Sequence, residues 1–283
     1  MRIFILFIAA GGAFLLFFAG KRVLRNRRRR QLTAMPFPQE WETILEKNVA
    51  IYRCLPGGLR DQLRNDIKIF MDEKRFEGLG GLELTDEITV TIAAEACMLL
   101  LNRENRYYPG LVSILVYPGA YVAKENTPIG GGVYVEGPSV RLGESWKHGS
   151  VILAWDDVKR GARNAEDGHN VVIHEFAHQL DQEDGLADGA PLLGKQSSYA
   201  VWAEIMNEEY ERLRAAAGRH KKSVLDEYGA TNPAEFFAVA TETFFEKPRQ
   251  LKKRAPYLYV ELKEFYKIDP AAWEKGDTGS HDA

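Results

Sequence analysis

The chain has 283 residues, of which 45% are hydrophobic and 27% charged, with a formal net charge of −3. These values exclude wholesale disorder. The charge is unevenly spread: residues 1–30 hold eight cations and no acid, so the remaining residues carry −11. Because an acidic body repels phosphate, we expect no nucleic-acid partner. Only two cysteines are present, which argues against a disulfide framework and fits a reducing compartment.

The first feature along the chain is an uncharged segment, Ile3–Gly20, followed directly by KRVLRNRRRR at 21–30. As a helix, this segment spans about 27 Å, which matches the hydrocarbon core of a bilayer. No small-residue cleavage site precedes the cations, so an anchor explains the segment better than a cleaved signal peptide does. The positive-inside rule places the following residues in the cytoplasm, and the arginines can also bind anionic lipid. We therefore expect a transmembrane anchor over 1–20 and a basic juxtamembrane linker over 21–36.

The remaining chain alternates between helical and strand patterns. Apolar residues at helical spacing predict helices over 39–53, 58–76, 85–102, 168–182, 199–217, 233–245 and 256–266. Short β-rich runs predict strands over 111–117, 121–124, 133–136 and 150–155, forming a small sheet or meander. The fold class is thus α+β, mostly helical with one small sheet. We expect a single domain over 37–270 and a disordered polar tail over 271–283.

The strongest motif is His174-Glu175-Phe176-Ala177-His178, an HExxH sequence flanked by apolar residues. Positions i and i+4 share a helix face, so His174 and His178 can bind one metal ion. Zn²⁺ suits this ligand set, and Glu175 can then take a proton from a zinc-activated water. We expect Asp167 to cap the start of the helix.

A catalytic zinc needs a third protein ligand. No third histidine follows His178 at short range, although Asp184 and Asp188 are formal candidates. A later segment, NPAEFFAVATE at 232–242, offers Glu235 in the first turn of an apolar helix and Glu242 two turns further on. We favour Glu235 as the ligand and Glu242 as a carboxylate that supports the site.

Other side chains are weaker candidates. Tyr228 lies seven residues before Glu235, where its phenol can donate to the oxyanion of a tetrahedral intermediate, although a loop tyrosine is more often a packing residue. Asp181 can orient a ligand imidazole or serve as a loop contact. We expect the remaining histidines to be solvated: His148, His169, His220 and His281.

The sequence resembles the Mlc titration factor A family of zinc-dependent, gluzincin-like metallopeptidases. The resemblance rests on RLGESW at 141–146, VILAWDDV at 151–158, DGHNVVIHEFAHQLDQEDG at 167–185 and YGATNPAEFFAVATETFF at 228–245. It implies a zincin-like domain with His174, His178 and Glu235 as zinc ligands, Glu175 as base and Tyr228 as oxyanion donor. It also implies aminopeptidase-like activity on small substrates and, for some members, binding of a transcriptional repressor.

Two hypotheses follow. The first is a zinc metallopeptidase anchored in the bacterial inner membrane, with its catalytic domain facing the cytoplasm and a peptide or protein as substrate. One predicted strand, 133–136 or 151–155, is expected to pair with extended substrate. The second is a regulatory protein that sequesters a transcriptional repressor or another cytoplasmic partner. The intact Glu175 favours the peptidase, because a pure binding protein needs no general base.

Overall fold

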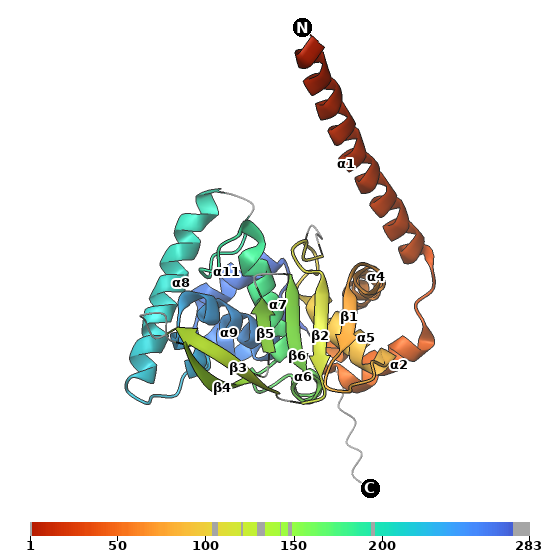
Figure 1. The fold of residues 1–283 in the computed structure, drawn as a ribbon. Coiled ribbons are helices and arrows are strands. Elements are labelled where there is room, and N and C mark those ends of the chain that lie inside the picture. Colours follow the sequence, from red (N-terminus) through yellow and green to blue (C-terminus); the bar gives the residue numbers. More distant parts are fainter. Residues whose placement is uncertain are drawn as a thin grey trace.

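A long N-terminal helix precedes the folded domain. The computed structural model describes the backbone of residues 2–103, 107–119, 121–128, 134–141, 143–146, 149–193 and 196–273, and their side chains outside 2–16, 121–128, 134–141, 143–146 and 196–198. Helix α1 extends over Arg2–Ala34 and ends beside α4, Gly57–Glu73 (Figure 1). Residues 21–34, expected as a linker, are therefore helical, and only residues 35–38 separate α1 from the next helix.

Two ion pairs fasten α1 to α4. Arg29 binds Glu73 through two nitrogens, at 2.6 and 2.8 Å, and Arg28 binds Asp72 at 2.6 Å. Within the residues whose side chains the structure describes, no helix is long and apolar enough to cross a membrane. Most of the segment Ile3–Gly20 lies outside those side chains, so the anchor stays a prediction.

The sheet has four strands in the order β1-β2-β6-β5. Strands β1, β2 and β6 are parallel, and β5 is antiparallel to β6. Their bounds are β1 Arg75–Gly78, β2 Ser113–Tyr117, β5 Gly143–Trp146 and β6 Ser150–Ala154. Of the two expected arrangements, small sheet or meander, the structure shows the small sheet. Consecutive strands do not pair as a meander requires, because β2 pairs with β6 in parallel. Helix α5, Asp86–Met98, connects β1 to its parallel neighbour β2.

Two strands form a separate antiparallel ladder, β3 Tyr121–Pro128 with β4 Tyr134–Arg141. The predicted run 150–155 corresponds to β6, which is bonded to a neighbour on both sides. It therefore has no open edge, and the expectation that it pairs with substrate was wrong. The first strand was missed because RFEG has a single apolar residue and was assigned to the end of the helix before it.

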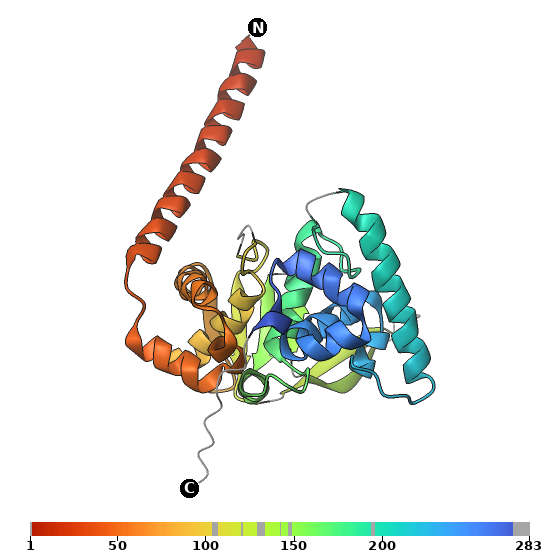
Figure 2. The ribbon, with the colours of Figure 1, turned by 180° about the vertical axis from the view of Figure 1, so that it is seen from behind.

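Helix α7, Val171–Asp181, lies between the sheet and the C-terminal helices (Figure 1). It packs on β5, β6 and α5. On its other side lie the C-terminal helices, gathered away from α4 (Figure 2). Their bounds are α8 Gln196–Ala217, α9 Pro233–Glu246, α10 Pro248–Arg254 and α11 Pro256–Tyr266.

Most predicted helices are confirmed, with shifted ends. The expected helix over 39–53 is divided at Val49 into α2, Gln39–Asn48, and α3, Ala50–Cys54. Helix α6, Trp155–Arg163, and α10 were not predicted, because both are too short for a clear apolar period. At the C-terminus, Trp273 is only 9% exposed, so the packed part extends beyond 270, and the rest of the expected tail, 274–283, lies outside the described residues.

The core reaches from α4 through α7 to α11. Phe176 on α7 contacts Phe70 of α4 and Tyr108, with ring centroids 5.8 and 4.8 Å apart. Burying each such ring contributes roughly 1.5–3 kcal/mol. The inner face of α7 is thus fixed by packing, which holds its polar face in one orientation.

Candidate metal centre

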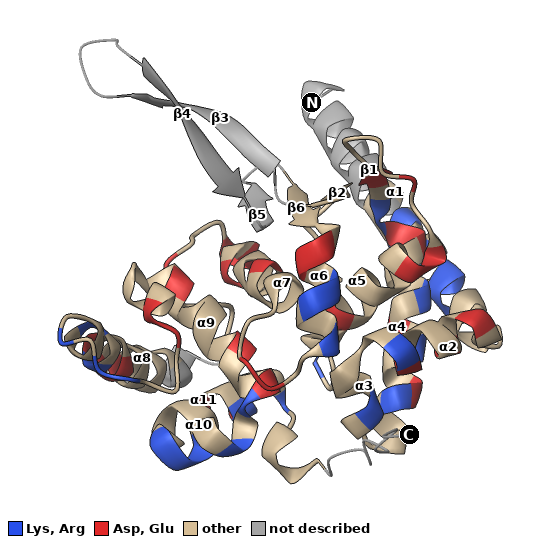
Figure 3. Ribbon diagram, turned by 90° about the horizontal axis from the view of Figure 1, so that it is seen from below, with Lys and Arg blue, Asp and Glu red and all other residues tan. Residues whose placement is uncertain are grey.

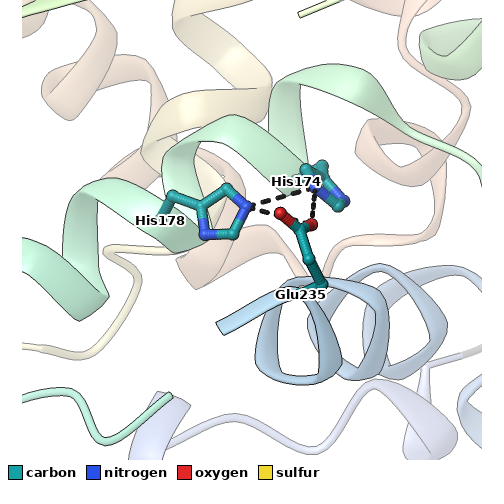
Figure 4. Close-up of side chains that lie close together, drawn as sticks. All are labelled: His174, His178 and Glu235. Atoms are coloured by element: carbon teal, nitrogen blue, oxygen red, sulfur yellow. Dashed lines mark hydrogen bonds and ion pairs between the residues drawn. The ribbon is translucent and has the colours of Figure 1, made fainter. Parts of the chain in front are cut away.

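The two motif histidines lie one turn apart on α7. Val172, Ile173 and Phe176 are fully buried on the same helix and determine which way it faces. His174 and His178 consequently point to the same side, with their Nε2 atoms 3.2 Å apart (Figure 4).

The helix begins at Asn170. Its Oδ1 accepts a hydrogen bond from the backbone N–H of Ile173 at 3.0 Å. The predicted cap, Asp167, was wrong, because Gly168 has a φ of +76°, which a helix cannot continue through. Asp167 instead accepts from the backbone N–H of His169 in the preceding turn.

Glu235 comes from the first turn of α9, which packs against α7. Asn232 caps this helix by accepting from the backbone N–H of Glu235 at 3.0 Å. Oε2 of Glu235 lies 3.0 Å from Nε2 of His174 and 3.4 Å from Nε2 of His178 (Figure 4). The structure therefore brings together the three residues that the sequence proposed as ligands.

These separations fit a tetrahedral metal ion. The three ligand atoms lie within 4.8 Å of one another, and among the described residues no other histidine, cysteine or carboxylate cluster meets that condition. Ligands about 2.0–2.1 Å from a tetrahedral ion are roughly 3.3–3.4 Å apart, close to the 3.0–3.4 Å found here. The donor set, two imidazoles and a carboxylate, is one that zinc accepts.

The site is strongly polarised. Burial opposes the charged form of His174, but its hydrogen bonds to Glu235 and Glu242 outweigh burial and raise its pKa to about 10. Burial likewise opposes the charge on Glu235, but the two histidines outweigh it and lower its pKa to about 2. Acidic residues lie on both α7 and α9, whereas basic residues are concentrated on α10 (Figure 3). The site thus holds negative charge that favours a cation.

Glu242 supports the first histidine. Its Oε1 lies 2.7 Å from Nδ1 of His174, and its side chain is 7% exposed. A hydrogen bond at Nδ1 fixes the ring orientation and leaves Nε2 free to face a metal. The sequence favoured a supporting role for Glu242, and the structure adds that its partner is Nδ1 of His174.

Glu175 and Tyr228 flank the cluster. Glu175 lies between the two histidines in sequence and is 5% exposed. Tyr228, in the short turn Glu227–Ala230, is 54% exposed, with its ring centroid 6.0 Å from that of His174. Burial raises the pKa of its phenol, and the charges of Glu235 and Glu175 raise it further, so the phenol keeps its proton.

The aspartates after His178 do not join the cluster. Oδ2 of Asp181 accepts from the backbone N–H of Gly189 at 3.0 Å, so of the two roles expected for this side chain the structure shows the loop contact. Asp184 and Asp188, formal candidates for the third ligand, accept from the backbone N–H groups of Leu186 and Ala190.

The other histidines lie apart from the ligand cluster. His169 is mostly exposed and lies 3.7 Å from Asp226, and His220 is exposed, as expected. His148 and His281 lie outside the described residues.

Sequence reasoning missed three residues behind the cluster: Asn170, Glu95 and Glu246. All three are at most 5% exposed. Two signals were available, since Asn170 directly precedes an apolar helix and Glu95 interrupts the apolar run TIAAEACM at 91–98. A lone acid in an apolar helix indicates a buried carboxyl group, but its partner is not readable from the sequence.

These features together define a class of protein. A mostly helical domain with a small parallel sheet, and a histidine pair joined by a glutamate from a later helix, is consistent with a zincin-like metallopeptidase.

The comparisons agree. Residues 23–267 match the model of the glucose-regulated metallo-peptidase M90 family, and the chain belongs to this family. It is 42% identical to the uncharacterized protein slr2042 of Synechocystis over 244 residues, covering 86% of this chain and 89% of that protein. It is 31% identical to Mlc titration factor A of Yersinia pestis and of Yersinia pseudotuberculosis over 242 residues, covering 83% of this chain and 88% of each relative. The resemblance inferred from the motifs is thereby confirmed.

Proposed function

We propose that this protein is a zinc peptidase that hydrolyses peptide bonds with Glu175 as general base. The observation that carries the proposal is the convergence of His174, His178 and Glu235 from two helices, at separations that suit one tetrahedral ion. Family membership supports the metallopeptidase class.

Each residue has a distinct task. Zinc, when held by the three ligands, supplies a Lewis acid that polarises a carbonyl oxygen and acidifies water. Glu175, on the same helix as the histidines, accepts the proton of the attacking water and passes it to the leaving amine. Tyr228 keeps its phenolic proton and donates a hydrogen bond to the developing oxyanion.

The specificity proposed is that of an aminopeptidase acting on small peptides. It rests on the resemblance to the family as a whole, which implies aminopeptidase-like activity. Paired substrates test it: an aminoacyl chromogenic substrate and its N-acetylated form. An aminopeptidase cleaves the free amine and leaves the blocked substrate intact.

We also propose that α1 anchors the domain in the inner membrane, facing the cytoplasm. The uncharged segment Ile3–Gly20 and the seven cations that follow it support this topology. The Arg29–Glu73 and Arg28–Asp72 pairs would then hold the domain close beneath the helix. The test is a fusion, after Ala283, to a reporter enzyme that is active only outside the cytoplasm. Activity of this fusion would refute the proposed orientation.

A second candidate is regulatory binding. Two relatives are named Mlc titration factor A, which links those proteins to Mlc. On this hypothesis the present chain sequesters a transcriptional repressor, and its metal site stabilises the fold.

One experiment separates the two candidates. The full-length chain, purified in detergent, is assayed for zinc content and for cleavage of a peptide library, beside Glu175→Gln and the control Glu204→Gln. Glu204 is exposed on α8. The peptidase hypothesis expects one zinc per chain in all three proteins and hydrolysis lost only in Glu175→Gln. Hydrolysis that persists in Glu175→Gln refutes the assignment of the base, and a wild type without stoichiometric zinc refutes the proposed function.

A further inference from the structure

Behind the metal ligands lies a buried polar cluster whose centre is Asn170. It links three helices, because Asn170 precedes α7, Glu242 lies on α9 and Glu95 lies on α5. Buried polar groups are costly unless they are hydrogen-bonded, so a cluster of this kind requires an explanation.

Glu242 uses both of its oxygens. Oε1 contacts Nδ1 of His174 at 2.7 Å, and Oε2 accepts from the backbone N–H of Asn170 at 2.6 Å. The carboxylate therefore bridges the N-cap residue of α7 and the histidine one turn later. The orientation of the imidazole depends on both contacts, because a carboxylate held at one oxygen can rotate.

Asn170 uses its whole side chain as well. Its Oδ1 caps α7 by accepting from Ile173 N–H, and its Nδ2 donates to Oε1 of Glu95 at 2.5 Å. Asn170 and Glu95 are each 1% exposed. These two hydrogen bonds hold Asn170 in the cap position, from which its backbone N–H donates to Glu242.

Glu246 completes the cluster one turn after Glu242 on α9. It is 5% exposed, and burial raises its pKa to about 9, although the neighbouring Asn170 amide lowers it. Burial also raises the pKa of Glu95 to about 8. Burial thus favours the neutral form of both carboxyl groups, which limits the negative charge gathered around one amide.

We propose that Asn170, anchored by Glu95, positions Glu242 and through it the imidazole of His174. The inference rests on the proposed zinc site and adds the residues that orient it from behind. Asn170 and Glu95 are positioning residues that act through Glu242.

The test compares two variants of the cluster with a matched control in the full-length chain. Asn170→Ser keeps a capping oxygen but loses the donor to Glu95, and Glu95→Ala removes the acceptor. The control is Asn48→Ser, because Asn48 is also fully buried and donates to a glutamate of α5, Glu87, at 2.9 Å. Glu95→Gln is the conservative variant, since an amide oxygen can accept the same hydrogen bond.

Three readouts are used: zinc affinity by competition with a chromogenic chelator, the visible absorption of the Co²⁺-loaded protein, and the Tm of the metal-free protein. We expect Asn170→Ser and Glu95→Ala to bind zinc about tenfold more weakly and to alter the Co²⁺ spectrum. Asn48→Ser should lower the Tm yet leave both metal readouts unchanged. Glu95→Gln should keep the zinc affinity and the Co²⁺ spectrum of the wild type.

Zinc affinities within twofold of wild type and an unchanged Co²⁺ spectrum in Asn170→Ser would overturn the proposal, whatever happens to Tm. If Glu95→Ala does not fold, Asn170→Ser decides alone. A wild type that binds no zinc defeats the proposed function. A wild type that binds zinc and cleaves peptides, with unaffected variants, defeats only this inference.

Discussion

Nδ1 of His174 lies 2.7 Å from Oε1 of Glu242, while Nε2 of the same ring lies 3.0 Å from Oε2 of Glu235. The two glutamates are seven residues apart on α9, so one face of that helix contacts both edges of a single imidazole. The ring is consequently fixed by two carboxylates with different tasks, one facing the metal position and one behind it.

Removing the rear carboxylate should weaken the site without emptying it. We expect Glu242→Ala to bind zinc about 10- to 100-fold more weakly, because the imidazole loses its orienting partner and the Asn170 N–H loses its acceptor. Chelator competition measures the effect, with Glu204→Ala on the exposed face of α8 as control. Equal affinities in wild type and Glu242→Ala would contradict the assigned role.

The tyrosine beside the site should matter for turnover alone. We expect Tyr228→Phe to lower kcat by about 10²-fold with KM and zinc content unchanged, since its phenol acts only once the oxyanion forms. Tyr257→Phe is the control, because Tyr257 is 70% exposed on α11. Steady-state kinetics on one peptide decide the point, and a kcat equal to wild type in Tyr228→Phe would exclude the oxyanion role.

A glycine in the loop after α7 fixes where α9 begins. A Cβ on Gly189 would lie 2.4 Å from the backbone oxygen of Pro233, and its φ is +80°. We therefore expect Gly189→Ala to lower the Tm and to weaken zinc binding by displacing the turn that carries Glu235.

The control for this change lies in the same loop. Gly185 has a φ of +92° but open space around its Cβ position, so Gly185→Ala tests backbone strain without the clash. Zinc affinity should fall only in Gly189→Ala. If both variants bind zinc equally, the contact with Pro233 does not position Glu235.

The buried acid Glu246 should make stability depend on pH. Burial raises its pKa to about 9 in the folded protein, with Glu95, Glu242 and Asp167 raising it further and Asn170 lowering it. The folded state then binds more protons than the unfolded state between the ordinary glutamate pKa and pH 9. Stability is thus lost as pH rises through this window.

Glu246→Gln replaces the neutral acid with a permanently neutral amide. We expect its Tm to fall less steeply than that of wild type between pH 6 and 9, and to exceed it at pH 9. Thermal denaturation of the metal-free proteins across this range measures the difference. Parallel curves for the two proteins would mean that Glu246 is ionised in the fold.

The junction between α1 and the domain should depend on one arginine more than on its neighbours. Arg29 makes two hydrogen bonds to Glu73 and lies over the ring of Tyr107, with 19% of its side chain exposed. We expect Arg29→Ala to lower the free energy of unfolding by about 1 kcal/mol. Arg30 is exposed and serves as the control position. Denaturant titration in detergent compares the free energies of unfolding of Arg29→Ala and Arg30→Ala. Equal losses in the two variants would contradict a specific stabilising role for Arg29.

The sequence predicted the site better than the sheet. Helical spacing put His174 and His178 on one face and Glu235 and Glu242 on another, and the structure brings these two faces together. A helix face is set by neighbours three to seven residues away, so local spacing is sufficient.

The sheet needed contacts between distant segments. Strand β1 is a four-residue polar run that exists because Phe76 pairs with Ile114, thirty-eight positions later in the chain. Such pairing has no local signature, because a short polar strand draws its stability from the strand beside it. The two roles left open for Asp181 could not be separated for the same kind of reason, since its partner is the backbone of a folded loop.

The sequence by itself determined the two helix faces that carry the candidate ligands, the glutamate between the histidines, and the uncharged segment with its cations. Only the tertiary structure decided the parallel strand order, the continuation of α1 to its ion pairs with α4, and the buried cluster of Asn170, Glu95 and Glu246. The physical reason is the distance along the chain over which each interaction acts. Helical periodicity acts between near neighbours, whereas the hydrogen bonds of Asn170 join residues 72 and 75 positions apart and exist only once three helices have packed.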